Sequence, residues 1–115
     1  MTGRLAVDFG TSNTVVTLWN ETRREGAPLH IPDFGRQQQQ GAETISVVPS
    51  LIHYAEDGRR WIGNQVLQKG LYHSNHTLRW MKRYISNRSP YRVRMDGKDI
   101  TPFSAGQDFL STVLL

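Results

Sequence analysis

Residues 7–14, Val-Asp-Phe-Gly-Thr-Ser-Asn-Thr, constrain the fold more than any other segment, because they join two runs that alternate like β-strands. In residues 4–9 apolar side chains alternate with Ala6 and Asp8, and residues 14–19 follow the same period of two. The connecting turn consists of Gly10, Thr11, Ser12 and Asn13. This pattern predicts an antiparallel hairpin with a polar turn.

The composition of this turn is suited to binding phosphate. Gly10 lacks a Cβ, so it can take a positive φ and let another group approach its backbone closely. The side chains and backbone N–H groups of Thr11, Ser12 and Asn13 can face one concavity, which is the arrangement that holds phosphate oxygens. Asp8 at the end of the first strand is placed to hold a hydrated Mg²⁺. An ordinary polar turn with a capping aspartate fits the same residues, so the spacing alone leaves both interpretations open.

The letters D-F-G-T-S-N-T resemble the first phosphate loop of the actin-like ATPase superfamily, D-x-G-T-T/S-x-S/T. Further segments, in the same order, resemble motifs of the DnaK-type 70-kilodalton heat-shock chaperones. Residues 47–52, V-V-P-S-L-I, are similar to T-P-S-Y-V, and residues 61–66, W-I-G-N-Q-V, to L-I-G-x-x-A. Residues 76–83, H-T-L-R-W-M-K-R, resemble N-T-x-x-x-x-K-R, and residues 95–102, M-D-G-K-D-I-T-P, resemble V-x-G-K-x-x-T-P. The resemblance extends over residues 4–115.

The resemblance implies an N-terminal piece of a nucleotide-binding domain with the ribonuclease-H-like fold of actin-like ATPases. It implies ATP or ADP with Mg²⁺ as cofactors, and a parent protein that couples ATP hydrolysis to binding and release of unfolded polypeptide. Clients, co-chaperones and a cytoplasmic location follow from the same resemblance. The fragment itself offers one wall of a nucleotide cleft, so hydrolysis is expected of the parent rather than of these 115 residues.

The resemblance also assigns roles to single residues. Phosphates would be bound by Gly10, Thr11, Ser12 and Asn13, and Asp8 would hold Mg²⁺ through water. Lys82 would position the attacking water and stabilise charge that develops on the γ-phosphate. Periodicity alone makes Lys82 a solvated surface lysine, so this catalytic role depends on the resemblance.

The composition excludes several kinds of protein and binding site. The hydrophobic fraction of 37% and mean hydropathy of −0.51 are low for a self-sufficient core, and no apolar run approaches the ~18 residues of a membrane span. The absence of cysteine excludes disulfides and thiolate zinc sites, which fits a reducing cytoplasm. The net charge of +4 and pI of about 9.9 would suit an anionic partner.

The rest of the chain predicts a mixed α/β or α+β arrangement. We expect three parts: the hairpin in residues 1–20, a linker in residues 21–44, and a neighbouring subdomain in residues 45–115. Within the linker, residues 29–31 could form a short strand and the four glutamines of residues 37–40 a solvated loop tip. Beyond it we expect strands in residues 46–54, 91–95 and 99–101, an Asp57-Gly58 turn, and helices in residues 63–70 and 75–85.

The last residues indicate a helix whose start has two possible caps. Thr101 could be the N-cap with Pro102 at the first helical position, or Ser104 could form a capping box with Gln107. No stop signal follows, so we expect a truncated piece of a larger protein. The apolar side chains expected to lack a partner are those of Leu110, Val113, Leu114 and Leu115.

Two other functions are compatible with parts of the sequence. A bacterial filament protein of the actin-like superfamily would share the loop, although Lys82-Arg83 and the motif near Lys98 favour the chaperone family. A non-catalytic nucleic-acid module could use the arginines and aromatic residues of residues 79–94, since stacking and phosphate neutralisation bind single strands. Simple packing and solvation explain that stretch better, because no recognised nucleic-acid module signature is present.

Overall fold

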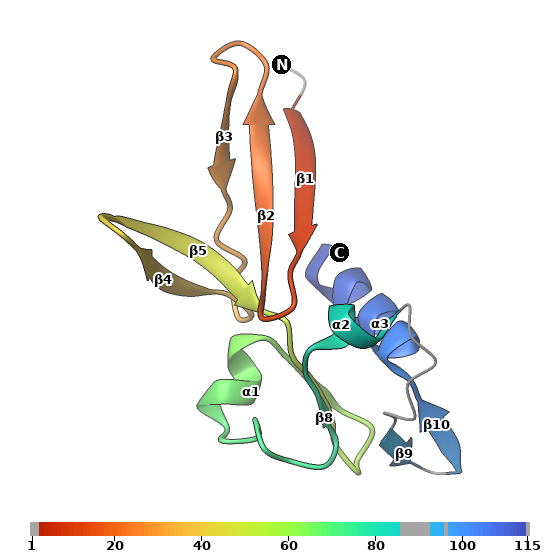
Figure 1. The fold of residues 1–115 in the computed structure, drawn as a ribbon. Coiled ribbons are helices and arrows are strands. Elements are labelled where there is room, and N and C mark those ends of the chain that lie inside the picture. Colours follow the sequence, from red (N-terminus) through yellow and green to blue (C-terminus); the bar gives the residue numbers. More distant parts are fainter. Residues whose placement is uncertain (1–2, 86–92, 96, 115) are drawn as a thin grey trace.

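The computed structural model describes residues 3–85, 93–95 and 97–114, which form antiparallel sheets and short helices along an axis of 50 Å. In Figure 1 a long hairpin extends away from a lower part that holds the helices. Every strand pairing within the described residues is antiparallel. The predicted mixture of strands and helices is therefore confirmed at the level of fold class.

The predicted hairpin is present. Strands β1 (Gly3–Phe9) and β2 (Asn13–Asn20) pair along their whole length, from Phe9 opposite Thr14 at the turn to Gly3 opposite Asn20. The other edge of β2 is shared: its start pairs with β5 (Glu43–Pro49) and its far half with β3 (Glu25–Pro28). Figure 1 shows β3 following β2 while β5 diverges from it. The turn of the hairpin is thus held from one side by the end of β5.

The expected linker in residues 21–44 instead contains two strands, β3 and β4 (Arg36–Gln40). The four glutamines, predicted to be a loop tip, lie in β4 and pair with β5 around a turn at Gly41. Gln37 donates to the Ser46 hydroxyl at 3.0 Å, and Thr44 donates to the Gln39 side chain at 2.8 Å. These cross-strand hydrogen bonds stabilise a strand that shows no apolar alternation. The strand expected in residues 29–31 lies earlier, at β3.

A second sheet follows the first after a break at Ser50 and Leu51. It consists of β6 (Ile52–Tyr54), β7 (Arg60–Ile62) and β8 (Thr77–Leu78), with β6 in the centre. The predicted turn containing Asp57 and Gly58 joins β6 to β7, and the predicted short helix is α1 (Asn64–Gln68).

The helix predicted in residues 75–85 is much shorter than expected. It is α2 (Met81–Ile85), and Leu78 lies in β8 instead. Leu78 and Met81 are both fully buried. Their spacing of three residues therefore predicted correctly that they share the core, but predicted wrongly that they share a helix. Trp80 has a φ of 58°, which interrupts any helix at that position.

The last helix, α3 (Pro102–Leu114), follows the small hairpin of β9 (Val93–Met95) and β10 (Lys98–Ile100). Thr101 is its N-cap: the Ser104 N–H donates to the Thr101 hydroxyl at 3.2 Å, and the Thr101 N–H donates to the Ser104 hydroxyl at 3.1 Å. The first of the two predicted caps is therefore the one formed. The predicted contributions of Tyr91 and Asp96 to β9 and its turn lie outside the described residues.

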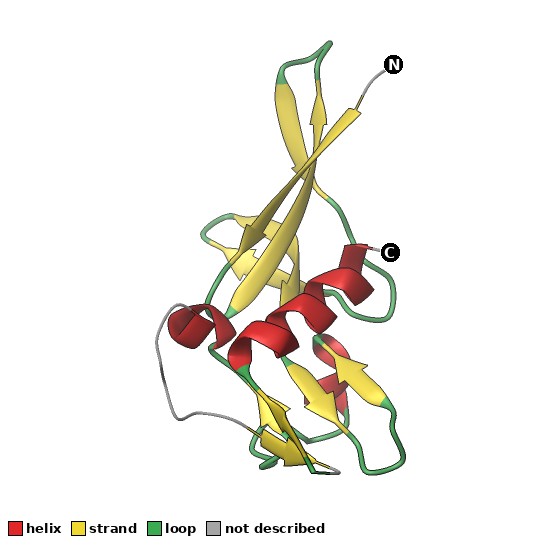
Figure 2. Ribbon diagram, turned by 90° about the vertical axis from the view of Figure 1, so that its right-hand side faces the viewer, coloured by secondary structure: helices red, strands yellow, loops and turns green. Residues whose placement is uncertain are grey.

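Helix α3 closes the core. Phe109 is fully buried and its ring centroid lies 5.9 Å from that of Phe9 at the end of β1. Figure 2 shows α3 crossing the molecule at this end of the hairpin. The expectation that Leu110 and Val113 would lack a partner is wrong, because both pack on the core, while Leu114 is exposed and Leu115 lies outside the described residues. None of the described helices is long and apolar enough to cross a membrane.

Candidate functional site: the turn of the first hairpin

The turn between β1 and β2 is closed by the Gly10 N–H, which donates to the Asn13 carbonyl at 2.9 Å. Gly10 is not among the residues with positive φ, so the expected left-handed conformation is not what requires glycine here. A Cβ at this position would instead overlap the Asn13 carbonyl oxygen. Within the described residues, the backbone N–H groups of Thr11 and Ser12 make no hydrogen bond to the protein. Two backbone donors of the turn are thus open to a ligand.

Ser50 holds this turn in place from the end of β5. Its hydroxyl donates to the Gly10 carbonyl at 2.9 Å, and its N–H donates to the Ser12 carbonyl at 2.9 Å. The Thr14 hydroxyl lies 2.8 Å from the Ser50 hydroxyl. Because a serine has one hydroxyl proton and Ser50 uses it for the Gly10 carbonyl, Thr14 must be the donor in that pair. The Pro49-Ser50 motif is visible in the sequence, but its contact with the turn is not.

The glutamine strand also reaches the turn. The Asn13 side-chain amide donates to the Gln38 side-chain oxygen at 3.2 Å. This bond fixes the orientation of Asn13 and links β4 to the candidate phosphate loop.

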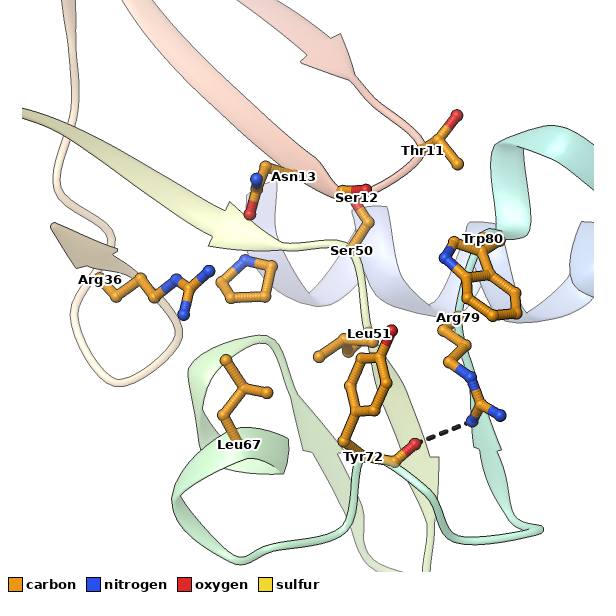
Figure 3. Close-up of a pocket in the computed structure, with 11 residues that line it drawn as sticks. Thr11, Ser12, Asn13, Arg36, Ser50, Leu51, Leu67, Tyr72, Arg79 and Trp80 are labelled. Atoms are coloured by element: carbon orange, nitrogen blue, oxygen red, sulfur yellow. Dashed lines mark hydrogen bonds between the residues drawn. The ribbon is translucent and has the colours of Figure 1, made fainter. Parts of the chain in front are cut away.

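A pocket of about 190 Å³ opens beside the turn (Figure 3). The turn residues Thr11, Ser12 and Asn13 border it. Its remaining lining comes from β4, the break after β5, α1 and the segments around β8, and consists of Arg36, Pro49, Ser50, Leu51, Leu67, Tyr72, Arg79 and Trp80. Residues far apart in the sequence therefore meet at this one concavity.

Arg79 is the cation of this pocket that the protein orients most. Its guanidinium donates to the Tyr72 carbonyl at 2.8 Å, drawn as a dashed line in Figure 3. The Arg79 Cζ lies 5.2 Å from the centre of the Tyr72 ring and 5.1 Å from that of the Trp80 ring. Cation–π contacts of this length are attractive. In the sequence Arg79 belongs to a general basic stretch, and no local pattern separates it from its neighbours.

Asp8 and Lys82 do not belong to the lining of this pocket. Asp8 is exposed at the end of β1, and Lys82 is exposed on α2. The carboxylate of Asp8 has no hydrogen bond or ion pair within the described residues, and no group of three or more potential metal ligands occurs there. A single free carboxylate fits Mg²⁺ only when water and a bound phosphate complete the coordination shell. The roles of Asp8 in Mg²⁺ binding and of Lys82 in catalysis therefore remain predictions.

The basic and aromatic stretch considered for nucleic-acid binding is only partly described. Arg88, Tyr91 and Arg92 lie outside the described residues. Arg79 and Trp80 belong to the pocket and contact each other.

Comparison with known proteins gives a limited similarity to DnaK. No protein-family model matches the chain. A "Chaperone protein DnaK" of Thermosipho africanus is 26% identical over 98 residues, which is 85% of this chain and 14% of that protein. A "Chaperone protein DnaK" of Trichormus variabilis is 28% identical over 102 residues, 80% of this chain and 13% of its own length. The match to the DnaK of Thermotoga maritima is 26% over 98 residues, 85% of this chain and 14% of that protein. The chain thus spans about one-seventh of the length of these relatives, and its sequence similarity points to the DnaK chaperones.

Proposed function

We propose that this chain is the N-terminal part of the ATP-binding domain of a DnaK-like chaperone ATPase. The observation that carries the proposal is the β1–β2 turn, which Ser50 holds beside an open pocket. Within the part of the chain that the structure describes, the N–H groups of Thr11 and Ser12 in this turn make no hydrogen bond. Backbone donors at a rigid turn are a common device for binding phosphate. The similarity to DnaK proteins supports the same assignment.

In this proposal Gly10, Thr11, Ser12 and Asn13 contact the phosphates of ATP or ADP, and Asp8 holds the Mg²⁺ of the nucleotide through water. Lys82 acts on the γ-phosphate. The larger protein would couple hydrolysis to the binding and release of unfolded polypeptide, with co-chaperones, in the cytoplasm. The actin-like ATPase fold belongs to the same proposal.

An NMR titration of the ¹⁵N-labelled chain with Mg-ATP tests the binding part. We expect the amide signals of residues 10–13 to shift with a dissociation constant in the millimolar range. The reason is that a few hydrogen bonds of about 1 kcal/mol each must offset the translational freedom that the ligand loses on binding. A dissociation constant of about 1 mM corresponds to a binding free energy of about 4 kcal/mol. Thr11→Val should weaken the shifts, whereas Thr17→Val in the middle of β2 serves as the matched control. Signals that move only outside residues 10–13 would contradict the phosphate-loop assignment, and micromolar affinity would contradict the assignment as one wall of a larger cleft.

The catalytic part is tested in a longer protein that carries this segment. There Lys82→Ala should lower kcat roughly tenfold or more while changing ATP affinity little, because its charge acts mainly on the transition state. Lys98→Ala, which removes an exposed lysine from β10, is the control. A Lys82→Ala enzyme that keeps the parental kcat would show that Lys82 is only a surface residue.

A further inference from the structure

Among the described residues, two arginines and no carboxylate line the pocket beside the hairpin turn. Arg36 lies on one side of it and Arg79 on the other (Figure 3). The remaining polar lining consists of hydroxyl and amide side chains, which bind anions as readily as neutral groups. In a chain with a net charge of +4, this lining favours an anionic ligand.

Arg79 is oriented before any ligand arrives. The Tyr72 carbonyl accepts one of its N–H groups, and the Tyr72 and Trp80 rings lie on its guanidinium. Within the described residues Arg79 makes no other hydrogen bond or ion pair, so most of its five donors remain available. A planar guanidinium held in this way loses little conformational freedom when it binds a phosphoryl group with two parallel hydrogen bonds.

Trp80 gives a second, independent indication. It has a φ of 58°, a left-handed conformation that is rare and strained for so bulky a residue. Such strain collects at binding sites, where the surrounding structure maintains it. In this conformation the exposed Trp80 ring contacts Arg79 and borders the pocket.

The size of the pocket limits what it can hold. Its volume of about 190 Å³ is below the ~300–1,000 Å³ of pockets that enclose a drug-sized ligand. It can therefore enclose phosphoryl groups but not a whole nucleotide. We propose that Arg79 is an anion-binding residue that contacts the phosphoryl end of the ligand held by Thr11 and Ser12. This inference rests on the proposed function and adds a cation to the site that is distinct from Lys82.

The test uses inorganic triphosphate, which lacks a base and a sugar, in an NMR titration of the full 115-residue chain. We expect the Trp80 indole signal and the amides of Thr11 and Ser12 to shift together. Arg79→Gln should weaken this binding about tenfold or more, and Arg79→Lys should weaken it several-fold although it keeps the charge, because a lysine cannot form the planar pair of hydrogen bonds. Arg4→Gln, which removes the same charge at the far end of the hairpin, should change affinity less than about twofold.

The outcomes separate this inference from the proposed function. If Arg79→Gln retains dispersed amide signals and binds triphosphate as the parent chain does, Arg79 is not an anion-binding residue, while the phosphate loop still stands. If neither triphosphate nor Mg-ATP shifts the amides of Thr11 and Ser12 in the parent chain, the proposed function fails. Glutarate provides a carboxylate comparison: binding as tight as that of triphosphate would overturn the assignment of a phosphoryl site.

Discussion

Ser50→Ala should destabilise the protein more than Thr14→Val, although each substitution removes one hydroxyl from the same buried pair. Ser50 is 1% exposed and Thr14 is fully buried. The Ser50 hydroxyl contacts both Thr14 and the Gly10 carbonyl, so alanine leaves a donor on Thr14 and an acceptor on Gly10 without partners. With about 1–3 kcal/mol for each of the two groups left unpaired, we expect a loss of about 2–6 kcal/mol in the free energy of unfolding.

Thr14→Val is milder because valine keeps the shape and β-branching of threonine. Ser50 can still donate to the Gly10 carbonyl and loses only an accepted hydrogen bond, which predicts a cost of about 1 kcal/mol. In the double variant the unpaired hydroxyl of Thr14 is gone. Its cost should therefore be smaller than the sum of the two single costs by about 1 kcal/mol or more.

Urea unfolding followed by circular dichroism measures these differences. With a slope of about 1–3 kcal/mol per molar urea, a loss of 2 kcal/mol moves the midpoint by roughly 0.7–2 M. Thr17→Val is the matched control, because the Thr17 hydroxyl has no hydrogen bond within the described residues. Equal single costs together with an additive double variant would refute the proposed direction of the hydrogen bonds from Thr14 through Ser50 to Gly10.

Three further predictions follow from particular backbone and side-chain positions. Gly63→Ala should lower the free energy of unfolding by about 2–4 kcal/mol, and Gly58→Ala by about 1 kcal/mol. Both glycines have a positive φ, but only at Gly63 would a Cβ lie 2.5 Å from the Phe34 carbonyl oxygen. Equal shifts of the urea midpoint would contradict this difference. In the same assay the Trp80→Gly variant should be more stable than Trp80→Ala by about 1 kcal/mol, because glycine tolerates a φ of 58°. The reverse order would show that the backbone at this position is not strained. Burial, and to a lesser degree the charge of His76, lower the pKa of His53 below 6.5 in the folded protein. The stability that neutral His53 provides is therefore present above pH 6.5 and is lost as the pH falls through this lower pKa. His53→Asn should flatten this part of the urea midpoint's pH dependence, and an unchanged slope would assign it to another group.

The parts of the fold that the sequence predicted are those that the local pattern alone determines. Residues 4–9 and 14–19 alternate with period two, and the register of β1 and β2 places Leu5 opposite Leu18 and Val7 opposite Val16 on one face. The polar turn needed no information from elsewhere in the chain. The cap at Thr101 was predictable for the same reason, since its hydrogen bonds are to Ser104 and Ala105, three and four residues further along the chain.

The errors occurred where distant contacts outweigh the local pattern. Strand β4 has no apolar side chain. Its glutamines form a strand only because they pair with β5, after the chain reverses at Gly41. In the predicted helix of residues 75–85, Leu78 pairs opposite Ile52 in the second sheet. The apolar spacing therefore predicted correctly that Leu78 is buried, but pairing with β6 makes this segment a strand rather than a helix.

The candidate site shows why the residues of the turn can be named from sequence when the pocket beside them cannot. Thr11 and Ser12 carry their donors wherever they lie, so the turn was a phosphate-loop candidate from its composition alone. Arg79 becomes part of the same site only because β2 pairs with β5, Ser50 ties the end of β5 to Gly10, and β6 pairs with β8 just before Arg79. Each of these steps is a contact between segments far apart in the chain, and none leaves a mark in the residues around Arg79. If phosphate binding requires Arg79 as well as the turn, it depends on the pairing of the folded sheets. A variant that keeps the loop motif but loses the Ser50 contact should therefore lose phosphate binding.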